Sequence, residues 1–243
     1  MGAGPGRLAL AGPGQSSGLP SPTRIAILIS GRGSNMEALL RATIAPLHIA
    51  LVLSNRPDAP GLATARAAGI ESLCIDHRKY PRDRPAHERA IQAELAARDI
   101  HVVALAGYLR LLTPYLVGCW EGRMLNVHPS LLPAFPGLDT HARALARGVR
   151  LHGCTVHLVT DAMDEGPILA QACVPVLPGD TEPALAARVL AQEHRLYPAA
   201  LRRFVLGPPP REDGGTPCGD DAPDLPPPGA ALLNPLPDPR PAP

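Results

Sequence analysis

The chain has 243 residues, 45% of them hydrophobic, which is enough for one good-sized domain or two small ones with a buried core. Its 23 Lys and Arg residues balance 22 Asp and Glu residues, so the net charge of +1 gives no electrostatic reason to expect nucleic acid or an anionic membrane as a partner. The five cysteines are scattered without a CxxC pair, and no apolar run is long enough to span a bilayer, which favours a reduced, cytoplasmic setting.

The two ends of the chain differ in composition from its middle. Residues 1–23 are rich in Gly, Pro and Ser, and residues 207–243 are rich in Pro, which removes backbone donors. Such segments lose much entropy on ordering and bury little apolar surface in return. We therefore expect a disordered leader, a disordered tail, and one folded domain over residues 24–206.

Short apolar runs alternate with helical patterns along this domain. The alternation predicts an α/β fold, in which an open, mostly parallel, twisted sheet carries helices on both faces. The expected strands are residues 25–29, 49–53, 72–75, 102–106 and 124–127, and the helical patterns between them cover residues 35–42, 62–68 and 87–98.

The pattern changes after the fifth expected strand. Two further strands, at residues 154–159 and 168–176, are joined by a turn-rich segment, which predicts an antiparallel extension of the sheet. Thr181 is a suitable cap for a final helix that runs toward Phe204.

A glycine loop follows the first expected strand, in the segment SGRGSN. Gly31 and Gly33 permit a tight turn that leaves backbone N–H groups free at a helix start, where a phosphate can bind. The loop lacks the third glycine of a dinucleotide site and the Gly-Lys-Ser/Thr of a Walker A loop, so a mononucleotide-type phosphate is the better match. The plainer alternative is that the two glycines only make the turn.

Asn126 and His128 lie at the end of the fifth expected strand, where period-two alternation places both side chains on one face. In open parallel sheets the carboxyl ends of the strands form the ligand-binding edge. An amide and a protonated imidazole together suit a reaction that passes through a tetrahedral oxyanion. Taken alone, such a pair also occurs as a hydrogen-bonded structural contact.

In this order, the glycine loop, the Asn-x-His cluster and a later acidic turn resemble those of the glycinamide ribonucleotide formyltransferases of purine biosynthesis. The resemblance extends from Arg24 to Phe204 through SGRGSN, LAGYLRLL, NVHPSLLPAFPG and HGCTVHLVTDAMDEGPILAQ. It implies a formyltransferase domain with a Rossmann-like sheet over residues 24–206. It also implies transfer of the formyl group of 10-formyltetrahydrofolate, as co-substrate, to the amine of glycinamide ribonucleotide, by direct attack through a tetrahedral oxyanion.

The resemblance also implies roles for individual residues. Asn126 and His128 would stabilise the oxyanion, and the carboxylate of Asp164 would favour protonated His128 and pass protons through a bound water. The ribonucleotide site would comprise Gly33, Ser34, Asn35 and Glu193. The folate site would comprise Arg84, Leu109, Arg110, Leu111, Leu112, Asn126, Thr160, Asp161, Ala162, Met163 and Asp164.

Two positions depart from the family pattern. Asp139 stands where some members have His, and Leu190 replaces a polar residue that helps to bind substrate elsewhere, so neither is assigned a role.

Other candidates receive structural interpretations. His152 and His157 are assigned to sheet packing or the surface, and His141 to a helix start. The basic residues Arg78, Lys79, Arg82 and Arg89 are assigned to a solvated helix entrance, and Asp161 and Asp164 to a turn rather than a metal site.

The expected partners are therefore the two small-molecule substrates, with no metal, nucleic acid or membrane, and the protein is expected to be a monomer or homodimer. Formyltetrahydrofolate hydrolases and transfer RNA formyltransferases share the Asn, His and Asp arrangement, so the trio predicts formyl chemistry more specifically than it predicts the acceptor. A hydrolase, or a non-catalytic nucleotide-binding module, remains the alternative.

Overall fold

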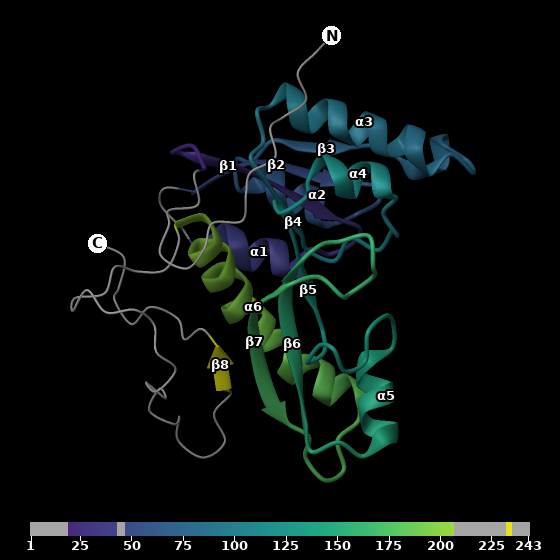
Figure 1. Ribbon diagram of the computed structural model, residues 1–243, viewed down its shortest axis with the longest axis vertical. Helices are drawn as coiled ribbons and strands as arrows, with labels where there is room; N and C mark the ends of the chain where they lie inside the picture. Colours follow the sequence, from purple (N-terminus) through teal and green to yellow (C-terminus); the bar gives the residue numbers. More distant parts are fainter. Residues whose placement is uncertain (1–18, 43–46, 207–231, 235–243) are drawn as a thin grey trace, which may run out of the picture.

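The computed structural model describes residues 19–42, 47–206 and 232–234. One sheet of eight strands crosses this part of the chain in the order β3-β2-β1-β4-β5-β6-β7-β8 (Figure 1). The first five strands in the chain are parallel to one another, and the pairs β5–β6, β6–β7 and β7–β8 are antiparallel. The strands are β1 (Thr23–Ile29), β2 (Leu47–Ser54), β3 (Ser72–Cys74), β4 (Val102–Leu105), β5 (Met124–His128), β6 (Leu151–Leu158), β7 (Ile168–Pro175) and β8 (Leu232–Asn234).

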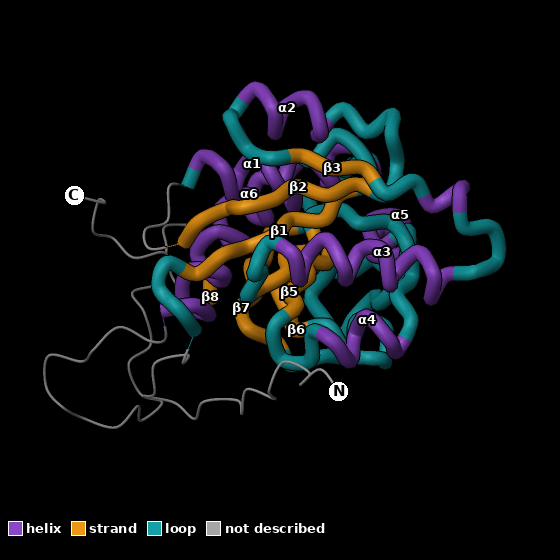
Figure 2. Tube along the Cα trace, turned by 90° about the horizontal axis from the view of Figure 1, so that it is seen from above, coloured by secondary structure: helices purple, strands orange, loops and turns teal. Residues whose placement is uncertain are grey.

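Helices cover both faces of the sheet. Figure 1 shows α1 and α6 side by side, and α3 and α4 lie together on the other face (Figure 2). The helices are α1 (Ser34–Arg41), α2 (Gly61–Ala67), α3 (Arg84–Ala97), α4 (Pro114–Cys119), α5 (Thr140–Arg147) and α6 (Glu182–Leu206), with a short 3-10 helix, η1 (His77–Lys79). The predicted fold class is confirmed, including the antiparallel extension.

The alternation of side chains along β1 explains the two-sided core. Ile25, Ile27 and Ile29 pack with α1, α2 and α6, whereas Ala26 and Leu28 pack with α3 and α4. A strand that is buried on both faces needs apolar residues at every position, and this is why β1 reads as an unbroken apolar run. Apolar runs of this kind mark the strands in the sequence, and the expected strand boundaries differ from the observed ones by only a few residues.

Helix ends account for most of the differences from the expected elements. Helix α3 begins at Arg84 rather than at residue 87, because the Asp83 carboxylate accepts a hydrogen bond from the Ala86 N–H at 2.8 Å and Pro85 suits the first turn. Thr181 caps α6 as predicted, although the bond from Ala184 N is long, at 3.4 Å. Helix α4 was not predicted, and α5 was anticipated only as a helix start near His141.

The terminal segments were expected to be disordered, and most of residues 1–23 and 207–243 lie outside the described residues. Thr23, the last residue of the expected leader, is the first residue of β1. Within the expected tail, Leu232–Asn234 form β8, which pairs antiparallel with Gln171–Cys173 of β7. The expectation that the tail contains no regular element is therefore wrong for these three residues, whose backbone groups find partners on the edge of β7.

Candidate functional site

The carboxyl ends of β1, β4 and β5 lie next to one another in the sheet, and each is followed by a segment with predicted site residues. The glycine loop follows β1, residues 107–113 follow β4, and residues 129–139, the β5–α5 loop, follow β5. A backbone hydrogen bond of 3.0 Å from Ser30 N to Gly107 O joins the first two segments. The order of the strands therefore gathers three distant parts of the sequence at one edge.

Asn126 is oriented by a histidine on the neighbouring strand. The side-chain nitrogen of Asn126 lies 3.3 Å from Nε2 of His157, which is directly opposite in the β5–β6 register. Nδ1 of His157 lies 2.9 Å from the carbonyl oxygen of Leu158 and must donate to it, so Nε2 of the neutral ring accepts. Asn126 thus donates one amide hydrogen to His157 and has a second to offer to a ligand.

His157 is kept neutral by its surroundings. Burial lowers the pKa of its ring, and the hydrogen bond to Leu158 and the nearby carboxylate of Asp164 only partly oppose this effect. The residue is 2% exposed, so of the two positions predicted for His157 sheet packing is confirmed and the surface is wrong; the contact with Asn126 adds a polar interaction that was not predicted. Only the cross-strand register reveals this contact, because nothing in the local sequence specifies which residue faces Asn126.

His128 is held between a backbone carbonyl and a carboxylate. Its Nε2 lies 3.1 Å from the carbonyl oxygen of Phe135 and must donate to it, while Nδ1 lies 3.5 Å from Oδ2 of Asp164. Phe135 has a φ of 55°, an uncommon conformation for a bulky residue, within the β5–α5 loop that returns over His128. In the neutral ring Nδ1 is therefore the unprotonated nitrogen, and it faces the acid.

Asp164 connects the acidic turn to the β5–α5 loop. Its Oδ2 accepts a 2.8 Å hydrogen bond from the Gly137 N–H, and its Oδ1 lies 3.8 Å from Nε2 of His157. The Asp164 side chain is 10% exposed, so little water competes for it. Asn126, His128 and Asp164 are thus brought together as the resemblance implied, with His157 as a fourth member.

A second histidine pair lies behind His128. His152 is buried, its Nε2 lies 3.2 Å from Nδ1 of His141, and its ring packs against that of Phe135 in a T-shaped arrangement. Burial, together with the neighbouring His141 and His128, lowers the pKa of His152 to about 4. The packing role predicted for His152 matches these contacts.

The glycine loop has the geometry of an anion site. Gly33 has a φ of 78°, helix α1 begins directly after it, and no side chain caps the first turn, so the N–H groups of that turn remain available. Gly61, at the start of α2, donates from its N–H to Gly31 O at 3.2 Å. A Cβ at Gly61 would lie 2.9 Å from Arg32 O, so the loop backbone requires glycine there.

Asn35 and Glu193 form a buried pair between α1 and α6. The Asn35 side chain donates to Oε2 of Glu193 at 2.6 Å. Burial raises the pKa of Glu193, and the hydrogen bond from Asn35 opposes that rise. Oδ1 of Asn35 is buried without a hydrogen-bond partner. Two of the four predicted ribonucleotide residues, Asn35 and Glu193, are therefore in contact, and Oδ1 of Asn35 is an unused acceptor.

The predicted folate residues fall into two groups. In the first group, Arg84 and Arg110 line one open cleft of about 650 Å³. Leu109 and Leu111, which flank Arg110 in the segment after β4, are 77% and 56% exposed, an unusual exposure for large apolar side chains. Leu112 instead packs against the core.

The acidic turn, residues 160–164, forms the second group. Thr160 Oγ1 donates to Ala162 O at 3.1 Å, Met163 lies beside Gly137, and Asp161 is exposed. This turn lies against the β5–α5 loop and does not line the cleft that contains Arg84.

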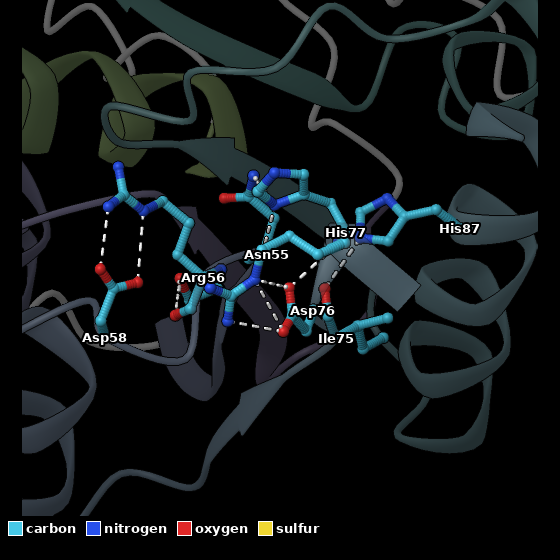
Figure 3. Close-up of polar contacts among 9 residues, drawn as sticks. Asn55, Arg56, Asp58, Ile75, Asp76, His77 and His87 are labelled. Atoms are coloured by element: carbon cyan, nitrogen blue, oxygen red, sulfur yellow. Dashed lines mark hydrogen bonds and ion pairs between the residues drawn. The ribbon is translucent and has the colours of Figure 1, made fainter. Parts of the chain in front are cut away.

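Ser30 joins the loops after β1, β2 and β4. Its hydroxyl donates to Oδ1 of Asn55 at 2.7 Å and accepts from Leu109 N at 2.8 Å. The carbonyl oxygen of Asn55 in turn accepts from Nδ1 of His77 at 2.8 Å (Figure 3). Ser30 and Asn55 are each 3% exposed. This connection between the segments predicted to bind the ribonucleotide and the folate was not itself predicted, because it depends on three strand ends meeting.

The two departures from the family pattern lie near the site. Asp139 precedes α5 with a φ of 54° and gives no side-chain cap, and Leu190 is half-buried in α6. Within the described ranges, no group of three or more His, Cys, Asp or Glu residues is placed to hold a metal ion. None of the helices in those ranges is long and apolar enough to cross a membrane.

Comparison with known proteins identifies the family. The formyl transferase family model matches residues 23–201. Phosphoribosylglycinamide formyltransferase of Escherichia coli is 44% identical over 186 residues, which are 75% of this chain and 87% of that protein. The crystal structure of phosphoribosylglycinamide formyltransferase from Brucella melitensis is 55% identical, with a TM-score of 0.72 over 76% of this chain and 96% of that chain.

A longer relative, the trifunctional purine biosynthetic protein adenosine-3 of Bos taurus, is 43% identical over 191 residues. The match covers 77% of this chain but only 19% of the length of that protein. Family model, relatives and solved structure all match the part of the chain that contains the site, and the chain therefore belongs to the formyl transferase family, in the branch of the phosphoribosylglycinamide formyltransferases.

Proposed function

We propose that the protein transfers the formyl group of 10-formyltetrahydrofolate to the amine of glycinamide ribonucleotide, a step of purine biosynthesis. The observation that carries this proposal is the placement of an amide donor, an imidazole and a carboxylate at the strand edge that also carries a phosphate-type loop. Relatives in the same family that are named phosphoribosylglycinamide formyltransferases support the choice of acceptor.

In the proposed reaction the amine lone pair attacks the formyl carbon, and the carbonyl π electrons move to the oxygen. The side-chain amide of Asn126 donates one hydrogen to His157, and its second hydrogen is the one that bonds to this oxyanion. Protonated His128 supplies a positive charge beside it. Since Nδ1 of His128 lies 3.5 Å from Asp164, beyond a direct hydrogen bond, the Nδ1–H can donate to the oxyanion while the carboxylate compensates the charge.

Collapse of the intermediate breaks the bond between the formyl carbon and the folate nitrogen. The attacking amine loses one proton and the departing nitrogen gains one, so the reaction needs a group that moves a proton without net consumption. We assign this transfer to Asp164, acting through a water molecule, because its carboxylate faces both histidines. Gly137 holds that carboxylate in place.

We assign the phosphate of the ribonucleotide to Gly33, Ser34 and Asn35, and its ribose hydroxyls to Glu193. The uncapped first turn of α1 supplies N–H donors, and the unused Oδ1 of Asn35 is available as an acceptor. The exposed apolar side chains of Leu109, Leu111 and Met163 suit the flat heterocycle of the folate. The carboxylates of its glutamate would meet Arg84 and Arg110.

A hydrolase using the same donor, or a nucleotide-binding module without turnover, is distinguished by one assay. The protein is mixed with 10-formyltetrahydrofolate and glycinamide ribonucleotide, and the folate absorbance is followed with and without the ribonucleotide. Turnover that depends on the ribonucleotide supports the proposal. Turnover without it supports a hydrolase, and ribonucleotide binding without turnover supports the binding module.

The proposed partners are these two small molecules, and the proposed setting is the cytoplasm, with the protein as a monomer or homodimer. The four cysteines within the described residues, Cys74, Cys119, Cys154 and Cys173, are free thiols, as is usual for a reducing compartment.

A further inference from the structure

The β5–α5 loop supplies backbone groups to two of the proposed catalytic side chains. The carbonyl oxygen of Phe135 accepts from Nε2 of His128 at 3.1 Å, and the N–H of Gly137 donates to Oδ2 of Asp164 at 2.8 Å. Nδ1 of His128 and Oδ2 of Asp164 lie 3.5 Å apart. Two loop groups that are close together in the chain therefore hold the imidazole and the carboxylate in place.

The backbone of this loop has an uncommon conformation. Phe135, Gly137 and Asp139 have φ values of 55°, 79° and 54°. Glycine adopts such values readily, whereas Asp does so at some cost and a bulky residue such as Phe at a greater one. A loop with two such residues keeps its shape only when the surrounding structure holds it. The position of Phe135 O therefore depends on contacts that the loop makes with other elements.

Arg143, near the start of α5, contacts the loop at three places. Its Nη1 donates to the carbonyl oxygen of Pro136 at 2.5 Å and to that of Leu138 at 3.3 Å. Its guanidinium carbon lies 5.7 Å from the centroid of the Phe135 ring, within the range of a cation–π contact. Among the described residues Arg143 forms no ion pair. Loop carbonyl oxygens and an aromatic ring are therefore the partners of its charge.

These contacts lie at the two loop residues that the proposed catalytic side chains use. The cation–π contact is with Phe135 itself, and the two bonded carbonyl groups belong to the neighbours of Gly137 on either side. Hydrogen bonds from a charged donor are stronger than those from a neutral one. Without them, Phe135 O can turn away from His128. The neutral ring can then carry its proton on Nδ1, where the carboxylate of Asp164 accepts it.

We propose that Arg143 is a positioning residue for the reaction, because it holds the β5–α5 loop in the conformation that fixes His128 and Asp164. Its effect on turnover rests on the proposed function, whereas its effect on the His128 ring does not. Arg143 acts through the loop and not through a substrate. Its loss should therefore lower kcat and leave the KM values nearly unchanged.

The first test compares variants in the formyl-transfer assay. We expect Arg143→Ala to lower kcat by roughly tenfold, the lower end of the effect of one hydrogen bond from a charged group, and to change each KM by less than about twofold. Lysine can donate to the same carbonyl oxygens but has no flat guanidinium, so Arg143→Lys should lower kcat by only roughly threefold. Arg147→Ala, an equal charge change at an exposed position of α5, should leave kcat unchanged.

The second test needs no turnover. The nitrogen chemical shifts of an imidazole show which ring nitrogen carries the proton, and the signals of His128 are identified by their absence in His128→Gln. At about pH 8.5, where an ordinary imidazole is neutral, we expect the proton on Nε2 in the unaltered protein and in Arg147→Ala. In Arg143→Ala we expect the proton to shift toward Nδ1, with Arg143→Lys between the two.

An unaltered kcat in Arg143→Ala would overturn the proposal, as would an equal loss of kcat in Arg147→Ala. A His128 ring that keeps its proton on Nε2 in Arg143→Ala would also overturn it. If the unaltered protein does not transfer the formyl group, the proposed function fails, and the ring signals alone decide whether Arg143 positions His128. If Arg143→Ala does not fold, the same outcomes in Arg143→Lys decide.

Discussion

The sheet edge has a first half around β1 and β4 and a second half around β5 and β6. The two halves hold their candidate ligand-binding groups in different ways. Around β1 and β4 many of the groups are backbone N–H donors and partly or fully exposed arginines, as in the glycine loop and in the cleft that Arg84 and Arg110 line. Around β5 and β6 they are buried side chains, each fastened at its far side, such as His128 to Phe135 O and His157 to Leu158 O. Binding of anions tolerates an open, charged surface, whereas stabilising a transition state requires donors that are held in place before the reaction.

The largest effect is expected in the second half, around β5 and β6. Asn126→Ala removes one oxyanion donor, which typically costs about 3 kcal/mol, so kcat should fall by on the order of a hundredfold. The KM for the ribonucleotide should change little, because the loop proposed to bind its phosphate is unaffected. Steady-state kinetics with both substrates varied provides the measurement. A nearly unaltered rate would remove Asn126 from the mechanism.

Ser30→Ala tests the connection between the loops of the first half. It leaves the buried Asn55 Oδ1 and the partly buried Leu109 N without a partner, so the free energy of unfolding should fall by about 1–3 kcal/mol. The KM for the folate should also rise, because Leu109 belongs to its predicted site. Urea denaturation and kinetics provide the measurements. Arg56→Ala is a neighbouring control, since Arg56 pairs with Asp58 at the surface (Figure 3) and its loss should change neither quantity.

Asn35→Ala tests whether the first half binds the acceptor. The change leaves the buried carboxylate of Glu193 without its donor, and we expect the KM for the ribonucleotide to rise by roughly tenfold, or about 1.4 kcal/mol. The KM for the folate should stay the same. Glu37→Gln, on the same helix and only partly buried, is the control. An equal rise in both KM values would show that the two halves do not bind separate substrates.

The smallest effect concerns acid sensitivity in the second half. Burial lowers the pKa of His152 from 6.5 to about 4, so between these values the unfolded chain binds more protons than the native one, and stability falls as the pH falls. His152→Gln should remove this contribution, reducing the slope of the free energy of unfolding against pH by up to about 1 kcal/mol per pH unit. Urea denaturation between pH 4 and 7 measures the slope, with the exposed His48→Gln as control. Equal slopes in all three proteins would contradict the assignment.

Prediction from sequence succeeded where local pattern was enough. The apolar run of β1, the turn at Gly33 and the shared face of Asn126 and His128 all follow from residues close together in the chain. It failed where a contact joins distant segments. His157 was assigned to packing or the surface because its partner, Asn126, lies 31 residues away across a strand pair whose register the sequence does not specify.

The basic stretch before α3 shows the same limit. The positive charge of this stretch is visible in the sequence, but a run of arginines is usually a solvated surface. The stretch lines a cleft only because the chain turns at Arg82 and because Arg110 approaches from the segment after β4. Arg110 is 26 to 32 residues away from Arg84 and Arg78, so local spacing carries no information about their meeting.

The sequence by itself determined the α/β architecture, the glycine turn after the first strand and the strand end with Asn126 and His128, because side-chain alternation and glycine turns are local properties of the backbone. The tertiary structure decided which nitrogen of His128 faces Asp164, which residue orients Asn126, and where the arginines of the cleft converge. Those outcomes depend on how loops return over the sheet edge and on how strands align, and both are set by packing over long distances in the chain.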